Sequence, residues 1–296
     1  MPIYDAAYRV LETRPLRPRA PWWTIATTMM RRTLKRHSIV RGLIFVIPAG
    51  FCFFATVVFY GRYMAGARGM DRALPIPGGL DKLDIFNMLG NQFLQAVGMF
   101  AVIFVALVGA PLIAEDHRAR ALSLYFSRPL KRREYVLGKL TAVVVLLSFL
   151  LILPPILMYL VEVVIAPTNI AMDRLPSLLW LLAISTAALV TFSAASLGAS
   201  ALTKRPAQAG ALLVGIMILL PATAQILAQQ LDAPGWLMLS PFEAIRALGR
   251  HHLPYLLAFD EPSRMSITRA WLTFPLWSAG CLSLLAWRVR RVEVVE

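Results

Sequence analysis

The chain has 296 residues, of which 58% are hydrophobic and only 16% are charged. Soluble domains usually carry about 25% charged residues, so this composition is typical of a protein that lies mostly in a lipid bilayer. A formal net charge of +14 would suggest nucleic-acid binding in a soluble protein. Here the basic residues flank apolar runs, which favours orientation in a membrane with anionic lipids instead.

The first 38 residues are polar and basic, and they precede every long apolar run. We interpret residues 1–38 as a cytoplasmic tail that ends in a helix. Within Trp22–His37, the side chains of Trp22, Ile25 and Met29 fall on one helical face, and arginines and lysines fill the others. This pattern predicts an amphipathic helix lying flat on the membrane surface. A simple basic anchor for the first span is the alternative.

Six apolar runs are long enough to cross a hydrocarbon core of about 30 Å, which takes about 20 helical residues. The runs are continuous rather than alternating, so they predict helices and not barrel strands. We expect an all-α integral membrane protein with six transmembrane helices, a permease domain over residues 39–289 and a short tail over 290–296. The predicted spans are Gly42–Tyr60, Phe93–Ala114, Thr141–Ala166, Ser177–Leu202, Ala207–Gln230 and Ala270–Trp287.

The distribution of Lys and Arg predicts the orientation of these spans. With the N-terminus inside, 21 of the 30 Lys and Arg residues fall in inside segments and 9 fall outside. Because positive residues are retained on the cytoplasmic side, we expect both termini in the cytoplasm and the spans in the plasma (inner) membrane.

Two outer segments carry local signals. Residues 61–92 are rich in Gly and Pro, and we expect them to be irregular apart from a short helix near Asp84–Leu89. Before the sixth span, Ser240, Pro241 and Glu243 form a helix-start pattern of an N-cap, a proline at the first turn and a capping-box acid. This predicts a short amphipathic helix between spans five and six. A surface helix and a re-entrant helix both fit.

The sequence shows no motif for catalysis or metal binding. It contains no GxxxxGK[ST] phosphate loop, no HExxH pair and no GxSxG turn. Both cysteines fall in apolar runs, which argues against a disulfide framework. We therefore expect that the chain is not an enzyme, binds no metal or cofactor itself, and takes any energy from elsewhere.

The spans hold almost no ionisable side chains. Glu162 is the exception, near the outer end of the third span, and we expect it to reach the interface, with a place in a transport pathway as the alternative. Gln225 and Gln229 of the fifth span are further pathway candidates. A proton- or sodium-driven carrier needs titratable or ion-coordinating groups at mid-membrane, so the sequence argues against one.

The polar insert between spans two and three is the most distinctive segment. An acidic pair is followed by Ser-Arg-Pro, a basic cluster, a tyrosine and Gly-Lys, and this order resembles the signature of permeases of the type-2 exporter family of ABC transporters. The six spans and the interfacial helix are similar to that family over essentially the whole chain, although Arg120-Ala121 stands where members often have Gly-Thr. The matching residues are Glu115, Asp116, Ser127, Arg128, Pro129, Arg133, Tyr135, Gly138 and Lys139.

The resemblance implies a membrane subunit without its own ATPase. Such a permease pairs with a second permease chain, identical or different, and docks a separate cytoplasmic ABC ATP-binding subunit that uses ATP. The loop over residues 115–140 would be the coupling segment, with charged pairs around an aromatic anchor. The candidate coupling residues are Glu115, Asp116, Arg118, Arg120, Leu122, Tyr125, Phe126, Ser127, Arg128 and Pro129.

The apolar walls of such a permease favour export of a hydrophobic or amphipathic cargo over an ion. Two alternatives remain at this stage. One is a non-transporting membrane scaffold or assembly factor with the same fold, and the other is a secondary carrier.

Overall fold

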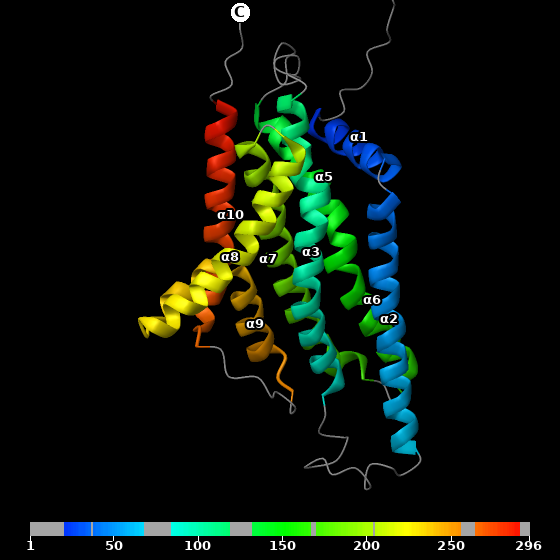
Figure 1. Cartoon of the computed structure of the whole chain (residues 1–296). Coiled ribbons are helices and arrows are strands. Elements are labelled where there is room, and N and C mark those ends of the chain that lie inside the picture. The colour runs from blue at the N-terminus through cyan, green and yellow to red at the C-terminus, as the bar shows by residue number, and fades with distance from the viewer. Residues whose placement is uncertain are drawn as a thin grey trace, which may run out of the picture.

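The structure is a computed structural model, and it describes seven parts of the chain: residues 21–36, 38–67, 84–118, 132–166, 170–203, 205–255 and 264–290. Within them the chain forms helices and short connections, with no strand, so the predicted all-α class is confirmed. The helices gather into one elongated bundle (Figure 1). They are α1 (Pro21–Arg36), α2 (Ser38–Ala67), α3 (Ile85–Arg118), α5 (Arg132–Leu151), α6 (Leu153–Ile165), α7 (Ala171–Leu202), α8 (Pro206–Gln230), η4 (Pro234–Leu239), α9 (Pro241–His252) and α10 (Ile267–Arg290).

All six predicted spans are confirmed as long apolar helices among the described residues. They correspond to α2, α3, α5 continued by α6, α7, α8 and α10. The third span is interrupted at Ile152, where Pro154 and Pro155 follow at the start of α6. Proline lacks a backbone donor and disturbs the preceding turn, which accounts for the break.

Most spans extend further than their apolar runs. The short helix expected near Asp84–Leu89 is wrong as a separate element, because these residues form the first turns of α3. The Asp84 carboxylate accepts a hydrogen bond from the Asn87 backbone N–H at 3.2 Å and from the Asn87 amide at 2.9 Å. Asp84 therefore caps α3, which begins at Ile85, eight residues before its predicted start at Phe93.

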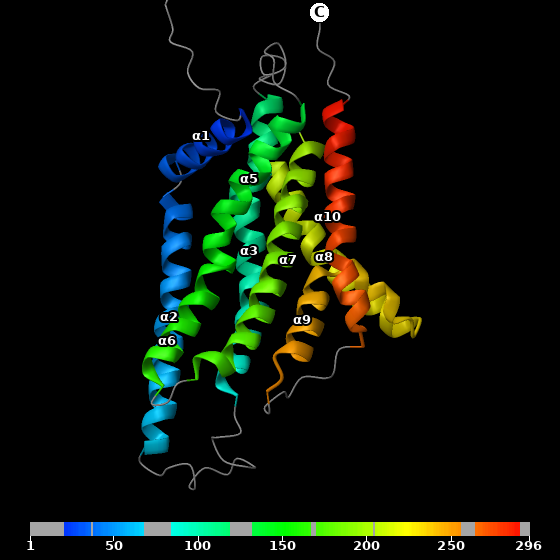
Figure 2. The ribbon, with the colours of Figure 1, turned by 180° about the vertical axis from the view of Figure 1, so that it is seen from behind.

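The helix α1 lies across one end of the bundle, the end at which α10 also finishes, and Figure 2 shows the same arrangement from behind. We call this the α1 end and the opposite one the α9 end. The side chains of Ala26, Met29 and Thr33 are buried against the bundle, while Arg31 and Arg32 are exposed. The predicted amphipathic helix is therefore confirmed, with its apolar face packed on protein.

The core is centred on α7. In its apolar stretch 61% of the residues are buried, against 22% in those of α2 and α8. The small residues of α7 allow this, because a Cβ on Gly109 of α3 would overlap the Ser196 side chain of α7. Small side chains let helices approach closely in a membrane protein, which accounts for the tight contact of α7 with α3.

The helix α9 lies inside the bundle and runs antiparallel to α3. The Phe242 ring would be 3.1 Å from a Cβ on Gly98. Thirteen residues at 1.5 Å each separate Gly98 from the start of α3 at Ile85, a distance of about 20 Å along that helix. The short helix predicted between spans five and six is confirmed, and it packs along the first part of α3.

Candidate functional site

The candidate coupling segment joins α3 to α5 at the α1 end. Residues 119–131 lie outside the described residues, so nothing is said of the candidates within that range. Those candidates are Arg120, Leu122, Tyr125, Phe126, Ser127, Arg128 and Pro129. The described part consists of the last turn of α3, with Glu115, Asp116 and Arg118, and the first turns of α5.

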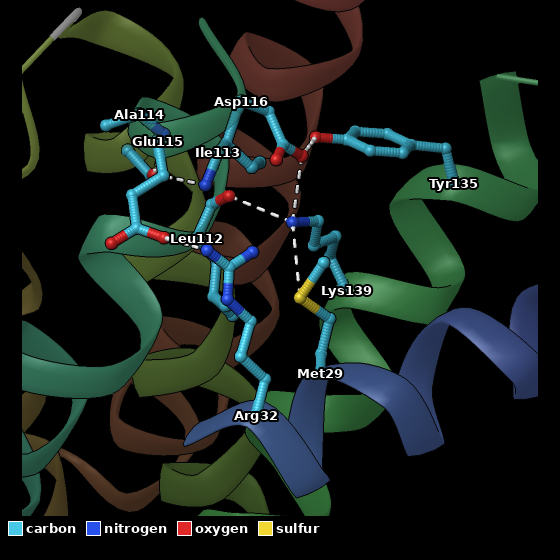
Figure 3. Close-up of polar contacts among 10 residues, drawn as sticks. Met29, Arg32, Leu112, Ile113, Ala114, Glu115, Asp116, Tyr135 and Lys139 are labelled. Carbon is cyan, nitrogen blue, oxygen red and sulfur yellow. Dashed lines mark hydrogen bonds and ion pairs between the residues drawn. The ribbon is translucent and has the colours of Figure 1, made fainter. Parts of the chain in front are cut away.

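A buried lysine ties these two helices together (Figure 3). The side chain of Lys139 is only 1% exposed, and its Nζ lies 2.9 Å from Oδ2 of Asp116. The same ammonium donates a hydrogen bond to the Leu112 carbonyl at 2.9 Å and lies 3.7 Å from the Met29 sulfur. A buried charge is tolerated when it is both paired and hydrogen-bonded, and these partners meet that requirement.

The Asp116 carboxylate has a second partner on α5. The Tyr135 hydroxyl donates to Oδ2 of Asp116 at 2.6 Å, and the Tyr135 side chain is fully buried. Tyr135 and Lys139 are four residues apart and therefore project from one face of α5. Asp116 thus joins the two helices at the point where the coupling segment leaves and re-enters the bundle.

Gly138, which precedes Lys139, lets α1 pack closely against α5. A Cβ at Gly138 would lie 2.8 Å from the Trp22 carbonyl oxygen and 2.9 Å from Cβ of Ile25. Only glycine lets the two helices approach this closely without displacement. The adjacent Lys139 then reaches Met29 of α1, so the Gly-Lys pair of the signature holds three helices in register.

The ion pair at the outer edge of the contact between α1 and α3 is weaker than the buried one. Arg32 of α1 lies 4.0 Å from Glu115 of α3, with side chains 60% and 33% exposed. Exposed ion pairs of this kind contribute about 1 kcal/mol or less to the stability of a protein. Arg118 is exposed at the end of α3. Glu115 and Arg118 are therefore the described coupling candidates that an outside partner can reach.

A serine from α7 holds the end of α3. The Ser200 hydroxyl oxygen accepts hydrogen bonds from the backbone N–H groups of Ile113 and Ala114, both at 3.0 Å. Pro111 lies two residues earlier inside the helix, where its ring disturbs the regular hydrogen-bond ladder. Ser200 offsets that disturbance and fixes the turn that carries Asp116 against the core.

The internal role of these signature residues does not follow from the sequence pattern. Asp116 was predicted to pair with an ATPase, and that prediction stays untested, but the structure gives its carboxylate two partners within the chain. Tyr135, Gly138 and Lys139 were recognised in the signature without being assigned a contact. The available signal was the four-residue spacing of Tyr135 and Lys139 on one helix face.

The pathway candidates do not form one site with each other. Figures 1 and 2 place α6, which carries Glu162, and α8, which carries Gln225 and Gln229, on opposite sides of the bundle. Gln225 and Gln229 are both exposed, and Gln225 donates to the Glu243 carboxylate of α9 at 2.8 Å.

Glu162 does not reach the surface, contrary to the favoured expectation. Its side chain is 0% exposed, and Oε1 lies 3.4 Å from Nε of Arg174. The same guanidinium pairs with Asp84 at 2.7 Å. Arg174 follows the third span in sequence and folds back over Glu162, which explains why the carboxylate is enclosed.

The described residues hold no group of three or more His, Cys, Asp or Glu that could bind a metal ion. A small cavity of about 30 Å³ lies between α1 and α3, beside Arg32, Pro111 and Glu115. Its volume suits about one water molecule and is too small for a cargo.

These observations define a multi-pass helical membrane protein with an ordered polar junction at one end of the bundle. A family model described as ABC-2 family transporter protein matches residues 23–284. The chain therefore belongs to the ABC-2 family of transporter proteins, and the predicted resemblance is confirmed. A search of the curated proteins found no match.

Proposed function

We propose that this membrane permease is the transport subunit of an ATP-driven exporter, powered by a separate ATP-binding subunit that docks at the α1 end. The observation that carries the proposal is the buried junction of Asp116, Tyr135 and Lys139. It lies at the base of the predicted coupling segment, where a force on that segment enters the bundle.

The junction makes the ends of α3 and α5 move together. Lys139 contacts α1, α3 and α5 at once. Interactions within a packed, low-dielectric interior resist separation. A displacement applied to residues 119–131 would therefore shift three helices as one body, as rigid-body switching requires. Closing and opening of an ATPase dimer would supply that displacement.

The exposed rim at this end would receive the ATPase. Glu115 and Arg118 offer opposite charges next to the coupling segment, and charged pairs at an interface rim fix register and partner choice. The α1 end then lies in the cytoplasm, in agreement with the predominance of Lys and Arg on that side.

A second permease chain would cover α2 and α8, the spans with the smallest buried share. Figure 1 shows α8 turning away from the bundle in its second half, and Pro221 lies inside that helix. The cargo would pass between the two chains, and the apolar side chains exposed on α8 favour a hydrophobic or amphipathic molecule.

Co-purification with the ATP-binding subunit tests the proposal. We expect the charge-reversed double variant Glu115→Lys/Arg118→Glu to lose most of the ATPase that co-purifies with the wild-type permease and most of its stimulated ATP hydrolysis. The matched control is Arg264→Glu, an exposed arginine in the part of the chain before α10. Unchanged co-purification in a folded double variant contradicts this docking surface.

A further inference from the structure

The helix α1 presents a basic face on the side that does not pack on the bundle. Ala26, Met29 and Thr33 are buried, whereas Arg31 and Lys35 are exposed. Residues 31 and 35 are four apart, so both project from one side of the helix, opposite the buried one. The sequence of α1 contains no acidic residue, so no side chain of the helix itself offsets this charge.

The described parts of the chain supply no anion for these two side chains. Neither Arg31 nor Lys35 has an ion-pair partner among the described residues, in contrast to Arg32, which lies 4.0 Å from Glu115. Three further segments adjoin the α1 end in sequence, and together they hold eight basic and four acidic residues. They are residues 1–20, 119–131 and 291–296. The exposed face of α1 therefore carries a positive charge that an outside partner can neutralise.

This basic face lies next to the point where the chain enters its first span. The helix α1 ends at Arg36, and the apolar stretch of α2 begins at Val40. Figure 1 shows α1 across the end of the bundle, with its last turn beside the start of α2. Arg41 in the first turn of α2 is exposed as well, and Trp23 at the other end of α1 is 45% exposed. Tryptophan and basic residues at the boundary of a span are typical of contact with lipid head groups.

We propose that the exposed basic face of α1, formed by Arg31 and Lys35 with Arg41 of α2, binds the head groups of anionic lipids. The opposite face of α1 holds Met29 at 3.7 Å from the Lys139 ammonium. A lipid that binds α1 in this position also stabilises its contact with the buried junction, because a ligand of the packed state favours that state. Lipid binding of this kind is independent of the proposed transport function.

The test compares two lipids with identical acyl chains, anionic phosphatidylglycerol and zwitterionic phosphatidylcholine. The purified full chain in a neutral detergent is titrated with each lipid, and native mass spectrometry measures the bound fraction. We expect phosphatidylglycerol to bind roughly 100-fold more tightly, about fivefold for each of the three basic residues. The double variant Arg31→Gln/Lys35→Gln should weaken its binding roughly 25-fold and leave phosphatidylcholine binding unchanged.

Further variants separate charge from side-chain shape. Arg31→Lys/Lys35→Arg keeps both charges and should keep the wild-type affinity. Arg41→Gln lies on α2 and should weaken phosphatidylglycerol binding about fivefold, which provides a variant if the double glutamine variant fails to fold. The matched control is Arg264→Gln/Arg269→Gln, which removes two exposed arginines at the start of α10, away from the α1 end.

A second measurement follows the effect of the lipid on α1. Phosphatidylglycerol should raise the unfolding temperature of the wild type more than that of Arg31→Gln/Lys35→Gln. Equal binding of the two lipids by the wild type, or an equal loss in the α10 control, overturns the proposal. If the double glutamine variant keeps its preference for phosphatidylglycerol but loses the co-purifying ATPase, the basic face binds a protein and the proposal is likewise overturned.

Discussion

Each end of the bundle contains a carboxylate that is buried beside a cation, but the two are held differently. At the α1 end, Asp116 is bound at 2.6 Å by Tyr135 and at 2.9 Å by Lys139. At the α9 end, Glu162 lies 3.4 Å from Arg174, and that arginine is shared with Asp84 at 2.7 Å.

The two cations differ in the ion-pair partners that they would keep if their buried carboxylates were neutralised. Lys139 has a single ion-pair partner among the described residues, Asp116, and is itself buried. Arg174 would keep Asp84. Asp116 is therefore the single ion-pair partner of its cation among the described residues, whereas the cation at the α9 end has a second partner.

The largest expected effect is that of Asp116→Asn. This change leaves the Lys139 ammonium buried without an anion, and breaking a buried pair in this way costs about 3–5 kcal/mol. Thermal unfolding of the purified permease in detergent measures the loss. The double variant Asp116→Asn/Lys139→Met removes both charges and should recover most of the stability, and failure to recover would indicate that the charge pair is not the cause.

The next effect in size is that of Gly138→Ala. The added Cβ would lie 2.8 Å from the Trp22 carbonyl oxygen, so α1 must move away from α5. Overpacking of this kind costs about 1–3 kcal/mol. Limited proteolysis between α1 and α2, together with thermal unfolding, reports the displacement. Gly50→Ala in α2 is the matched control, because no atom lies within 4 Å of its added Cβ. Equal effects of the two alanines would contradict the close approach.

Glu162→Gln should have a much smaller effect than Asp116→Asn, although it is the same chemical change. The glutamine has nearly the same shape and Arg174 keeps its pair with Asp84, so we expect a loss of about 1 kcal/mol or less. The same unfolding assay compares the two variants directly. A loss as large as that of Asp116→Asn would remove the distinction between the two ends.

The smallest effect concerns pH at the α9 end. The His252 ring stacks on Trp180 with centroids 3.6 Å apart, and burial, followed by the neighbouring His251, lowers the pKa of His252 below its ordinary value of 6.5. Because protonation then favours the unfolded state, stability is complete above that value and declines as the pH falls below it.

Unfolding temperatures between pH 5 and pH 8 measure this dependence on His252. His252→Phe keeps an aromatic ring beside Trp180 and cannot titrate, so its pH slope below 6.5 should be shallower than that of the wild type. A parallel slope in both proteins would assign the dependence to other groups.

The sequence predicts the spans well because about 20 consecutive apolar residues suffice to identify each of them. It also predicts the start of α9, where the Ser240 hydroxyl accepts from the Glu243 N–H at 3.2 Å. These features depend on neighbours in sequence, so a local pattern reveals them.

The sites are less predictable because they depend on distant partners. Lys139 resembles a boundary lysine until Asp116 and Leu112 are placed around it. The packing of α9 along α3 likewise depends on the contacts at Gly98 and Gly249, which join positions far apart in the sequence. Membership of the ABC-2 family now argues against a secondary carrier.

The register of α9 against α3 limits how this protein can change length. One residue inserted before Phe242 would shift the helix by about 1.5 Å and turn it by about 100°. Leu248 would then take the place of Gly249 opposite Asn91. We therefore expect related chains to vary in composition along α9 while keeping the seven-residue interval from Phe242 to Gly249, and an alanine-insertion series through residues 240–250 would show where length stops being tolerated.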